Sequence, residues 1–272
     1  MSGDSRPVGV FDSGIGGLTV VQHLMRMLPH EHIVYFGDTA RVPYGSRSRE
    51  VVEQYAVQDA AFLLSKNVKA IIIACNTVSA VGIDAVRQRF DVPLLGVILP
   101  GARAAAAATR NKRVGVIGTI ATVSSGSYTQ AIHAIDPAIT VFGQACPLFV
   151  PLAEEGWTHH RATEAIAEEY LHGLREERVD TLVLGCTHYP LLHDVIQNVM
   201  GPDVRIINSG EETARDARAF LEQRGLMNPG HEDARHEFFV SDVPLKFQEI
   251  GERFLGVSLA HVEKVDIHAV VA

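Results

Sequence analysis

The sequence predicts an α/β fold with two pseudo-symmetric parallel-sheet domains, built by an internal duplication, and an active site in the cleft between them. Three observations predict this fold class. Short apolar runs alternate with segments of helical periodicity, as in parallel sheets with helical crossovers. Strand signals of the first half return in the same order in the second half. Two matching runs end in a cysteine, at Cys75 and Cys186, so equivalent edges of the two sheets should each carry a thiol.

The strands are expected where apolar runs are bounded by polar residues. In the first half these runs cover residues 8–11, 33–37, 71–74 and a short segment after Asp91. In the second half they cover residues 114–118, 139–143, 182–185 and a short segment after Asp203. The first two pairs are offset by 106 residues, and the other two by 111 and 112. Four collinear matches favour a duplication over coincidence.

Helical periodicity fills the segments between these strands. It covers residues 18–28, 49–64, 80–90 and 102–109, and then 124–135, 161–175, 191–200 and 211–224. Two further strands, at 238–242 and 257–267, are expected to return to the first sheet. Turn signals at Pro100-Gly101 and Asn208-Ser209-Gly210 mark the crossings, giving a first domain of residues 1–98 plus 208–272 and a second of 99–207. A single (β/α)₈ barrel is the competing architecture, because eight strand–helix units are counted.

The composition is that of a globular protein with a substantial core, since 47% of its 272 residues are hydrophobic and 21% are charged. A net charge of −8 argues against a nucleic-acid partner. No apolar run has the length of a membrane span, and the N-terminus has no apolar signal core. We therefore expect no membrane association and a cytoplasmic location. The three cysteines fit free thiols, and no cysteine or histidine spacing indicates a metal site.

Polar residues follow the first two expected strands. The segment Asp12-Ser13-Gly14-Ile15-Gly16-Gly17 looks like a phosphate loop, but its spacing is not GxGxxG and no Walker lysine follows. A glycine-rich turn at a helix start can bind a substrate carboxylate as well as a phosphate. The simpler alternative is a tight turn without further function. Tyr44 and Gly45 lie in the loop after the second strand, which is either a substrate clamp or an ordinary turn.

The two strand-end cysteines carry the strongest functional signal. One cysteine in an apolar run is usually a small buried hydrophobe. Two at equivalent strand ends, each followed by hydroxyl or amide side chains, indicate a shared site. Cys146 has no counterpart in the first half and is interpreted as structural. Other candidates for the same cleft, each with an ordinary structural role as its alternative, are Thr119, Thr122, Glu154, Glu155 and His188.

Two opposed thiols suit a carbon acid that loses a proton on one face and gains one on the other, which inverts the stereocentre. The forward and reverse reactions require similar groups on the two faces of the carbon, and a duplicated fold supplies such a pair. No lysine is placed for a pyridoxal Schiff base, so we expect no cofactor. Catalysis would then come from desolvation, hydrogen bonds to the substrate carboxylate, and neighbours such as Asp12 and His188. A thiol with an ordinary pKa of about 8.5 needs only modest tuning to act as the base.

Five motifs, in order between residue 8 and about residue 256, resemble those of the glutamate racemase family. They are Phe11-Asp12-Ser13-Gly14-Ile15-Gly16-Gly17, Pro43-Tyr44-Gly45, Ala74-Cys75-Asn76-Thr77, Pro147-Leu148-Phe149-Val150-Pro151-Leu152 and Gly185-Cys186-Thr187-His188-Tyr189-Pro190. The resemblance implies a cofactor-independent racemase that interconverts L- and D-glutamate and supplies D-glutamate for peptidoglycan synthesis. It also implies a homodimer.

The resemblance further implies roles for single residues. Cys75 would remove the D-side proton and Cys186 the L-side proton. Asp12 and His188 would assist the two cysteines, with Glu154 near the second. Substrate contacts would fall on Asp12, Ser13, Tyr44, Gly45, Asn76, Thr77, Thr119, Thr122, Thr187 and His188. The chain departs from the family at Leu99, where members often carry an acidic residue.

Three rival functions remain open on the sequence. An aspartate or hydantoin racemase of the same superfamily would share the fold and thiols but differ in its side-chain pocket. A hydrolase or decarboxylase would need only one of the two cysteines and would pass through a covalent intermediate. An amino-acid-binding protein would also have two α/β lobes around a cleft, and would bind without turnover.

Overall fold

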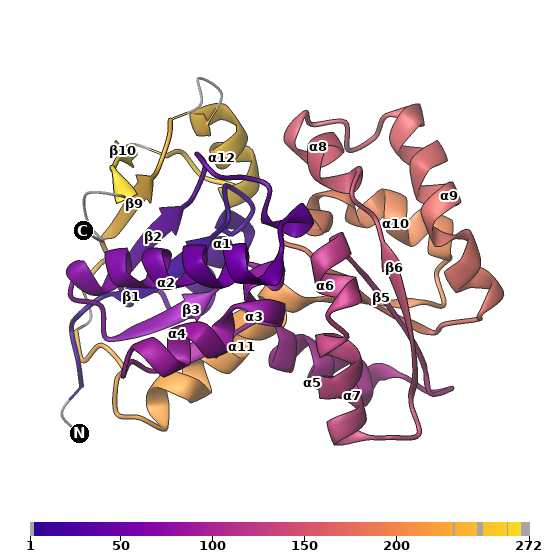
Figure 1. The fold of residues 1–272 in the computed structure, drawn as a ribbon, viewed down its shortest axis with the longest axis horizontal. Helices are drawn as coiled ribbons and strands as arrows, with labels where there is room; N and C mark the ends of the chain where they lie inside the picture. Colours follow the sequence, from indigo (N-terminus) through magenta and orange to yellow (C-terminus); the bar gives the residue numbers. More distant parts are fainter. Residues whose placement is uncertain (1–2, 231, 244–246, 260, 268–272) are drawn as a thin grey trace.

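Two parallel sheets lie side by side in the computed structural model, which describes residues 3–230, 232–243, 247–259 and 261–267 (Figure 1). The first sheet has the order β10-β9-β2-β1-β3-β4 and the second β6-β5-β7-β8. The strands of the first sheet are β1 (Val8–Asp12), β2 (Ile33–Gly37), β3 (Ala70–Ile73), β4 (Leu94–Gly96), β9 (His236–Val240) and β10 (Glu263–Lys264). Those of the second are β5 (Arg113–Gly118), β6 (Thr140–Ala145), β7 (Thr181–Gly185) and β8 (Arg205–Asn208). The two-sheet α/β fold is confirmed, and the barrel alternative is wrong.

The internal duplication is visible in strand order and register. The order β2-β1-β3-β4 of the first sheet matches β6-β5-β7-β8 of the second. Val8 pairs with Ala70, and Val114 with Thr181, which confirms the offsets of 106 and 111. The match expected for the second strand is wrong by two residues, because Ile33 lies opposite Val8 whereas Val141 lies opposite Val114. A shift of two residues leaves every side chain on the same face of the sheet, so the apolar pattern alone does not reveal it.

The central strands are buried on both faces. In β1, Val10 packs in one hydrophobic cluster with Leu24 of helix α1 (Leu18–Met27). The next residue, Phe11, packs in a second cluster with Leu63 of helix α2 (Arg49–Ser65). Helices on both sides therefore explain why the strands read as continuous apolar runs in the sequence.

The remaining helices largely follow the expected segments. They are α3 (Asn76–Val81), α4 (Ile83–Arg89), α5 (Ile98–Ala108), α6 (Ile120–Ser124), α7 (Ser127–Ile135), α9 (Arg161–Glu176), α10 (His193–Met200) and α11 (Ser209–Glu222). The helix expected at 80–90 is divided at Gly82. The turn expected at Pro100-Gly101 is wrong, because both residues lie in the first turns of α5. Proline is tolerated there, since the first N–H groups of a helix have no intrahelical partner.

The helices α8 (Phe149–Glu154) and α12 (Phe247–Leu255) escape the sequence prediction, and so does α6 except for its last residue, Ser124. The C-terminal segment returns to the first sheet as expected, with β9 pairing along β2. Within the stretch expected at 257–267, the only strand in the described part is the two-residue β10, and residue 260 lies outside the described residues. The strands fall into two sheets as the proposed domains require, and the exact domain boundaries stay a prediction.

Helices α5 and α11 carry the chain from the first sheet to the second and back. They pack against each other, and α11 also packs against α1 (Figure 1). Asn208 caps α11 by accepting hydrogen bonds from the N–H groups of Gly210 and Glu211. The expected turn at Asn208-Ser209-Gly210 is thus the end of β8 and the start of a helix. The two connections between the halves lie beside each other.

Candidate active site

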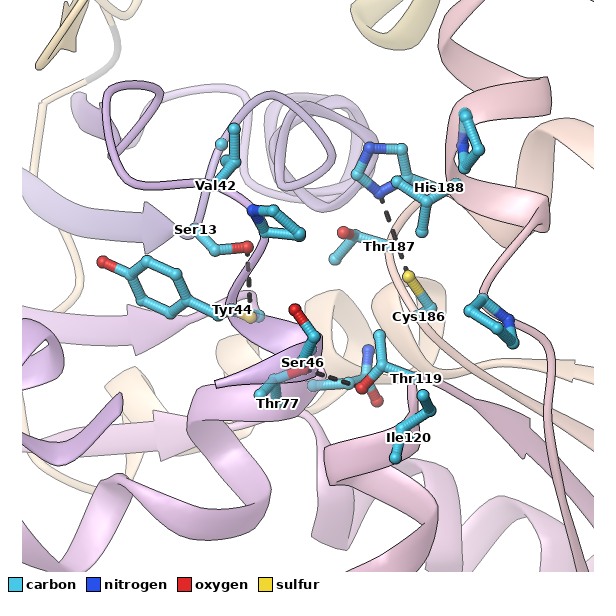
Figure 2. A pocket seen from close by; sticks show the side chains of 18 of the residues that line it. Ser13, Val42, Tyr44, Ser46, Thr77, Thr119, Ile120, Cys186, Thr187 and His188 are labelled. Carbon is cyan, nitrogen blue, oxygen red and sulfur yellow. Dashed lines mark hydrogen bonds between the residues drawn. The ribbon is translucent and has the colours of Figure 1, made fainter. Parts of the chain in front are cut away.

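A cavity of about 360 Å³ lies between the two halves, where the carboxyl ends of their central strands face each other. The first half contributes predicted residues that follow β1, β2 and β3: Ser13, Tyr44, Gly45, Cys75, Asn76 and Thr77. The second half contributes predicted residues that follow β5, β6 and β7: Thr119, Glu154, Cys186, Thr187 and His188. Figure 2 shows Ser13 and Tyr44 on one side of the cavity and Cys186 and His188 on the other. Both predicted thiols therefore line one shared cavity.

Cys75 lies two residues after the end of β3 and directly precedes α3, whose N-cap it is. Its side chain is buried, and its thiol lies 3.6 Å from Ser13 Oγ, to which it donates. Burial, and after it the nearby Asp12 carboxyl, raises the pKa of the Cys75 thiol to about 12. Desolvation and a neighbouring carboxylate both disfavour the thiolate. Cys75 thus carries its proton at neutral pH in the ligand-free protein.

Cys186 belongs to a relay of three side chains. Its sulfur lies 3.8 Å from Nδ1 of His188, and Nε2 of His188 lies 2.9 Å from Oε1 of Glu154 on α8. Burial lowers the pKa of His188, but hydrogen bonds to Cys186 and Glu154 outweigh it and raise that pKa to about 10. A protonated imidazole has two N–H donors, so one can serve the sulfur and the other the carboxylate. The relay thus places a cationic donor beside the second thiol.

Two predicted substrate contacts, Asp12 and Thr122, lie behind the cavity wall. Asp12 is fully buried, and its carboxylate accepts from the Gly14 N–H at 3.0 Å and from Thr187 Oγ1 at 3.4 Å. Thr122 is buried as well, with Oγ1 3.0 Å from Thr119 Oγ1 and 3.4 Å from Thr77 Oγ1. In this structure both support residues of the wall, and their direct contact with substrate stays a prediction.

The halves meet closely around the cavity. Thr77 Oγ1 of the first half lies 3.0 Å from Thr119 Oγ1 of the second. A Cβ on Gly45 would lie 2.6 Å from Thr119 Cβ, and one on Gly16 would lie 2.2 Å from Thr187 Oγ1. Both distances are below contact range, so these two positions have no room for a side chain.

The sequence prediction missed part of the lining. The missed residues are Gly14, Val42, Pro43 and Ser46 in the first half, and Ile120, Pro147, Val150 and Pro151 in the second. Each lies within or beside one of the five quoted motifs or next to a predicted residue, and that proximity is the signal that could have found them. Most are apolar, and apolar walls strengthen electrostatic interactions inside a closed site because they exclude water.

The charge inside the cavity is sparse. Among the residues that the structure describes, none of those lining the cavity is a lysine or an arginine. A substrate carboxylate would meet hydroxyls, the Asn76 amide, backbone N–H groups and the His188 imidazole. Over the described part of the chain no group of three or more His, Cys, Asp or Glu side chains is arranged to hold a metal ion. Over the same part, no helix combines the length and the apolar character that crossing a membrane requires.

Known proteins resemble this chain over nearly its whole length. A family model described as Asp/Glu/Hydantoin racemase matches residues 13–217. The glutamate racemase of Geobacter metallireducens is 51% identical over 264 residues, covering 97% of this chain and 98% of that one. That of Syntrophus aciditrophicus is 52% identical over 266 residues, covering 98% of both. The crystal structure of glutamate racemase from Francisella tularensis in complex with D-glutamate has a TM-score of 0.92 at 41% identity, over 98% of this chain and 99% of that one.

Proposed function

The chain belongs to the Asp/Glu/Hydantoin racemase family, and from this premise we propose that its cavity interconverts L- and D-glutamate through two thiols facing the α-carbon from opposite sides. One observation carries the proposal: Cys75 and Cys186 come from different halves of the chain and line the same cavity. Its full-length similarity to enzymes named glutamate racemase makes the chain a racemase and favours glutamate over aspartate or hydantoin.

The reaction needs a base on one face and an acid on the other. In the L-to-D direction, the Cys186 thiolate takes the α-proton, and the electron pair of the broken C–H bond moves into the substrate carboxylate as an enolate. The Cys75 thiol then gives its proton to the opposite face of the α-carbon, and its sulfur is left as a thiolate. The protonated Cys75 of the ligand-free protein suits this direction. One turnover leaves the reverse protonation state, which suits D-glutamate.

Neighbouring groups support each thiol. The protonated His188 lies beside Cys186 and is held by Glu154, so it stabilises negative charge on that sulfur. On the other side, the Ser13 hydroxyl lies close enough to donate to Cys75 once its sulfur is a thiolate. The hydroxyls and amides of Ser13, Asn76, Thr77, Thr119 and Thr187 are proposed to bind the substrate carboxylates, because they line the cavity between the sulfurs.

A substrate panel tests this function. L-glutamate, D-glutamate, L-aspartate and a hydantoin are incubated with the protein without added pyridoxal phosphate, and optical rotation is followed. We expect rotation to decay for both glutamate enantiomers. Cys75→Ser and Cys186→Ser should each lower the rate by about 10²- to 10⁴-fold, since each removes one acid–base group.

The rival functions give different outcomes in the same experiment. A one-cysteine hydrolase or decarboxylase would lose activity in only one of the two variants. An amino-acid-binding protein would show calorimetric binding of glutamate and no change in rotation. Faster racemisation of aspartate or of the hydantoin than of glutamate would contradict the substrate.

Three finer statements are also proposals. We propose that the enzyme supplies D-glutamate for peptidoglycan synthesis, which is the role of this enzyme class. A homodimer and a cytoplasmic location are predictions from the sequence. Sedimentation equilibrium would test the homodimer, and fractionation of cells would test the cytoplasmic location.

A further inference from the structure

Tyr44 lines the cavity with its ring, but its hydroxyl points away from Cys186 (Figure 2). The hydroxyl forms a hydrogen bond with Asp38 Oδ2 and lies 3.1 Å from Asp59 Oδ2. Tyr44 itself is almost fully buried. The hydroxyl is therefore engaged by two carboxyl groups of the protein rather than presented to a ligand.

A buried charged cluster surrounds this hydroxyl. Arg41 donates from Nε to Asp38 Oδ2 at 2.5 Å and from Nη2 to Asp59 Oδ1 at 3.0 Å. Its guanidinium carbon lies 4.1 Å from the centre of the Tyr55 ring. Both carboxylates are 0% exposed and the arginine side chain is 10% exposed. Asp38 also accepts from Ser241 Oγ at 2.7 Å, just beyond the end of β9.

The cluster holds two carboxyl groups, Asp38 and Asp59, and one guanidinium, Arg41. Burial, and after it the charge of Asp38, raises the pKa of the Asp59 carboxyl well above its ordinary value. A tyrosine hydroxyl has a single proton, so it cannot donate to both carboxyl groups at once. The raised pKa favours a proton on Asp59, and with that proton Asp59 can donate to Tyr44 while Tyr44 donates to Asp38 and Arg41 pairs with Asp38. Every buried polar group then has a partner, as a buried network requires.

None of Asp38, Arg41 and Asp59 lines the cavity, so they do not meet substrate in this structure. Their connections instead hold the loop after β2 to α2, which carries Asp59, and to the end of β9. The next residues of that loop, 42–46, all line the cavity. Buried ion pairs are seldom a net source of stability compared with apolar packing, so their presence favours a role in fixing one conformation.

We propose that Asp59 and Arg41 are positioning residues, which with Asp38 and the Tyr44 hydroxyl fix the loop 42–46 in the shape that binds substrate. The ring of Tyr44 forms part of the cavity wall, and its hydroxyl hydrogen-bonds to the carboxyl groups of the cluster. This inference rests on the proposed function for its substrate, glutamate. It assigns the substrate-binding role of the loop to its backbone and ring surfaces rather than to the phenol.

The test compares variants that break the cluster with one that preserves it. Tyr44→Phe removes the hydroxyl and keeps the ring, and Asp59→Ala removes its partner. Asp59→Asn keeps a donor and an acceptor at the same place and is the conservative rescue. Glu31→Gln is the matched control, because the Lys69–Glu31 ion pair (2.6 Å) is equally buried in the same half and lies away from the cavity.

Two readouts separate positioning from general destabilisation. We expect Tyr44→Phe and Asp59→Ala each to raise KM for glutamate by on the order of 10-fold or more, with a smaller fall in kcat, since a misplaced loop weakens binding. The double variant should be no worse than the worse single one, because both break one unit. Amide hydrogen exchange of peptides covering residues 42–46 should become faster in both. Asp59→Asn should keep KM within about 3-fold of the parent value, because it leaves the hydrogen bonds of the cluster in place.

Defined outcomes overturn the proposal. If Tyr44→Phe raises KM while a folded Asp59→Ala leaves KM and the exchange of residues 42–46 unchanged, the phenol contacts substrate itself. If Glu31→Gln changes KM and the hydrogen exchange of residues 42–46 as much as the cluster variants do, the cluster has no special connection to the loop. Because hydrogen exchange needs no turnover, it tests the positioning even if racemisation is absent, so failure of this inference and of the proposed function are distinguishable.

Discussion

Cys75 and Cys186 occupy equivalent strand ends, yet different neighbours surround the two sulfurs. Cys75 has the Ser13 hydroxyl in contact and the Asp12 carboxyl behind it, and burial raises its pKa to about 12. Cys186 has the imidazole of His188, which Glu154 holds from the other side. The duplication has kept the position of the thiols while their surroundings have diverged. The ligand-free protein is therefore asymmetric, although its reaction runs in both directions.

Glu154→Gln tests the relay at Cys186. The hydrogen bond to Glu154 helps to raise the pKa of His188 to about 10, so its loss should lower that pKa, which NMR titration of the imidazole measures. We expect kcat to fall by about 10²-fold, in the range of one acid–base group. Glu155→Gln is the control, because Glu155 is adjacent and does not line the cavity. An unchanged His188 titration in Glu154→Gln would contradict the relay.

The same histidine predicts how stability depends on pH. Its pKa is higher in the folded protein (about 10) than its ordinary value of 6.5, so the folded state holds the proton more tightly. The stabilisation by the charged imidazole is fully present below about pH 6.5 and is lost as the pH rises through about 10. The difference in free energy of unfolding between the parent and His188→Asn, from urea titrations, should shrink across that window. If the difference in free energy of unfolding between the parent and His188→Asn grows with pH, this stabilising role of the charged imidazole is contradicted.

The sequence located most site residues because they follow strand ends. It could not show which of them face the cavity. Asp12 and Thr122 have the right residue types at the right places, but hydrogen bonds from Gly14 and Thr187, and from the other threonines, hold them in a second layer. The apolar part of the wall, such as Val42 and Ile120, carries no chemical signal in a sequence. The packing of the tertiary structure decides which polar residues face the cavity and which apolar residues form its wall.

At the scale of elements, the cavity depends on the close approach of loops from the two halves, where Gly45 packs directly against the Thr119 side chain. Gly45→Ala should place its Cβ against Thr119 and push the halves apart, lowering kcat/KM by on the order of 10- to 100-fold. The matched control is Gly173→Ala in α9, where a Cβ meets nothing within 4 Å. That change should stabilise the protein by about 0.5–1 kcal/mol and leave activity unchanged, because alanine is the better helix former. Thermal melts measure the stability of the two variants, and the racemisation assay measures their activity. Full activity in Gly45→Ala would show that the halves do not need this close approach.

Helix α12 of the first half packs against the relay of the second. The ring of Phe254 meets the His188 ring edge-on at 5.2 Å, and Arg253 donates to the Glu154 carbonyl at 3.3 Å. Arg253→Ala should therefore lower kcat by about 3- to 10-fold, because Glu154 loses an anchor. Arg215→Ala on α11 is the control, since Arg215 is likewise a partly exposed arginine with helical ion pairs. Equal kinetics of the two variants would contradict a role for α12 in the relay.

The strands were predictable because buried parallel strands leave continuous apolar runs. The helices α8 and α12, and nearly all of α6, were not. Pro151 lies within the six-residue α8 and obscures its periodicity, and α12 is a nine-residue helix beyond the duplicated part of the chain. The first turns of α5 were taken for a connection, because Pro100 and Gly101 favour turns until the neighbouring packing is known.

At the scale of the whole molecule, one cavity is assembled from two copies of the same unit. The chain passes between them only through α5 and α11, which pack together. Both connections therefore lie at one place, and each half holds its thiol at the end of a central strand. Sequence repetition predicted the two copies, and the sheet order confirms them. Their facing arrangement follows from contacts such as Thr77 with Thr119, which no local pattern encodes.

The isotope pattern at the α-carbon tests the central claim most directly. L-glutamate is converted in D₂O and stopped early, and the deuterium content of the remaining L-glutamate and of the new D-glutamate is measured separately by mass spectrometry. Two thiols on opposite faces predict deuterium in the product and almost none in the remaining substrate, because the base that removes the proton differs from the acid that supplies the deuteron. Equal deuterium in both enantiomers from the start would mean that one group serves both faces, and would contradict the account.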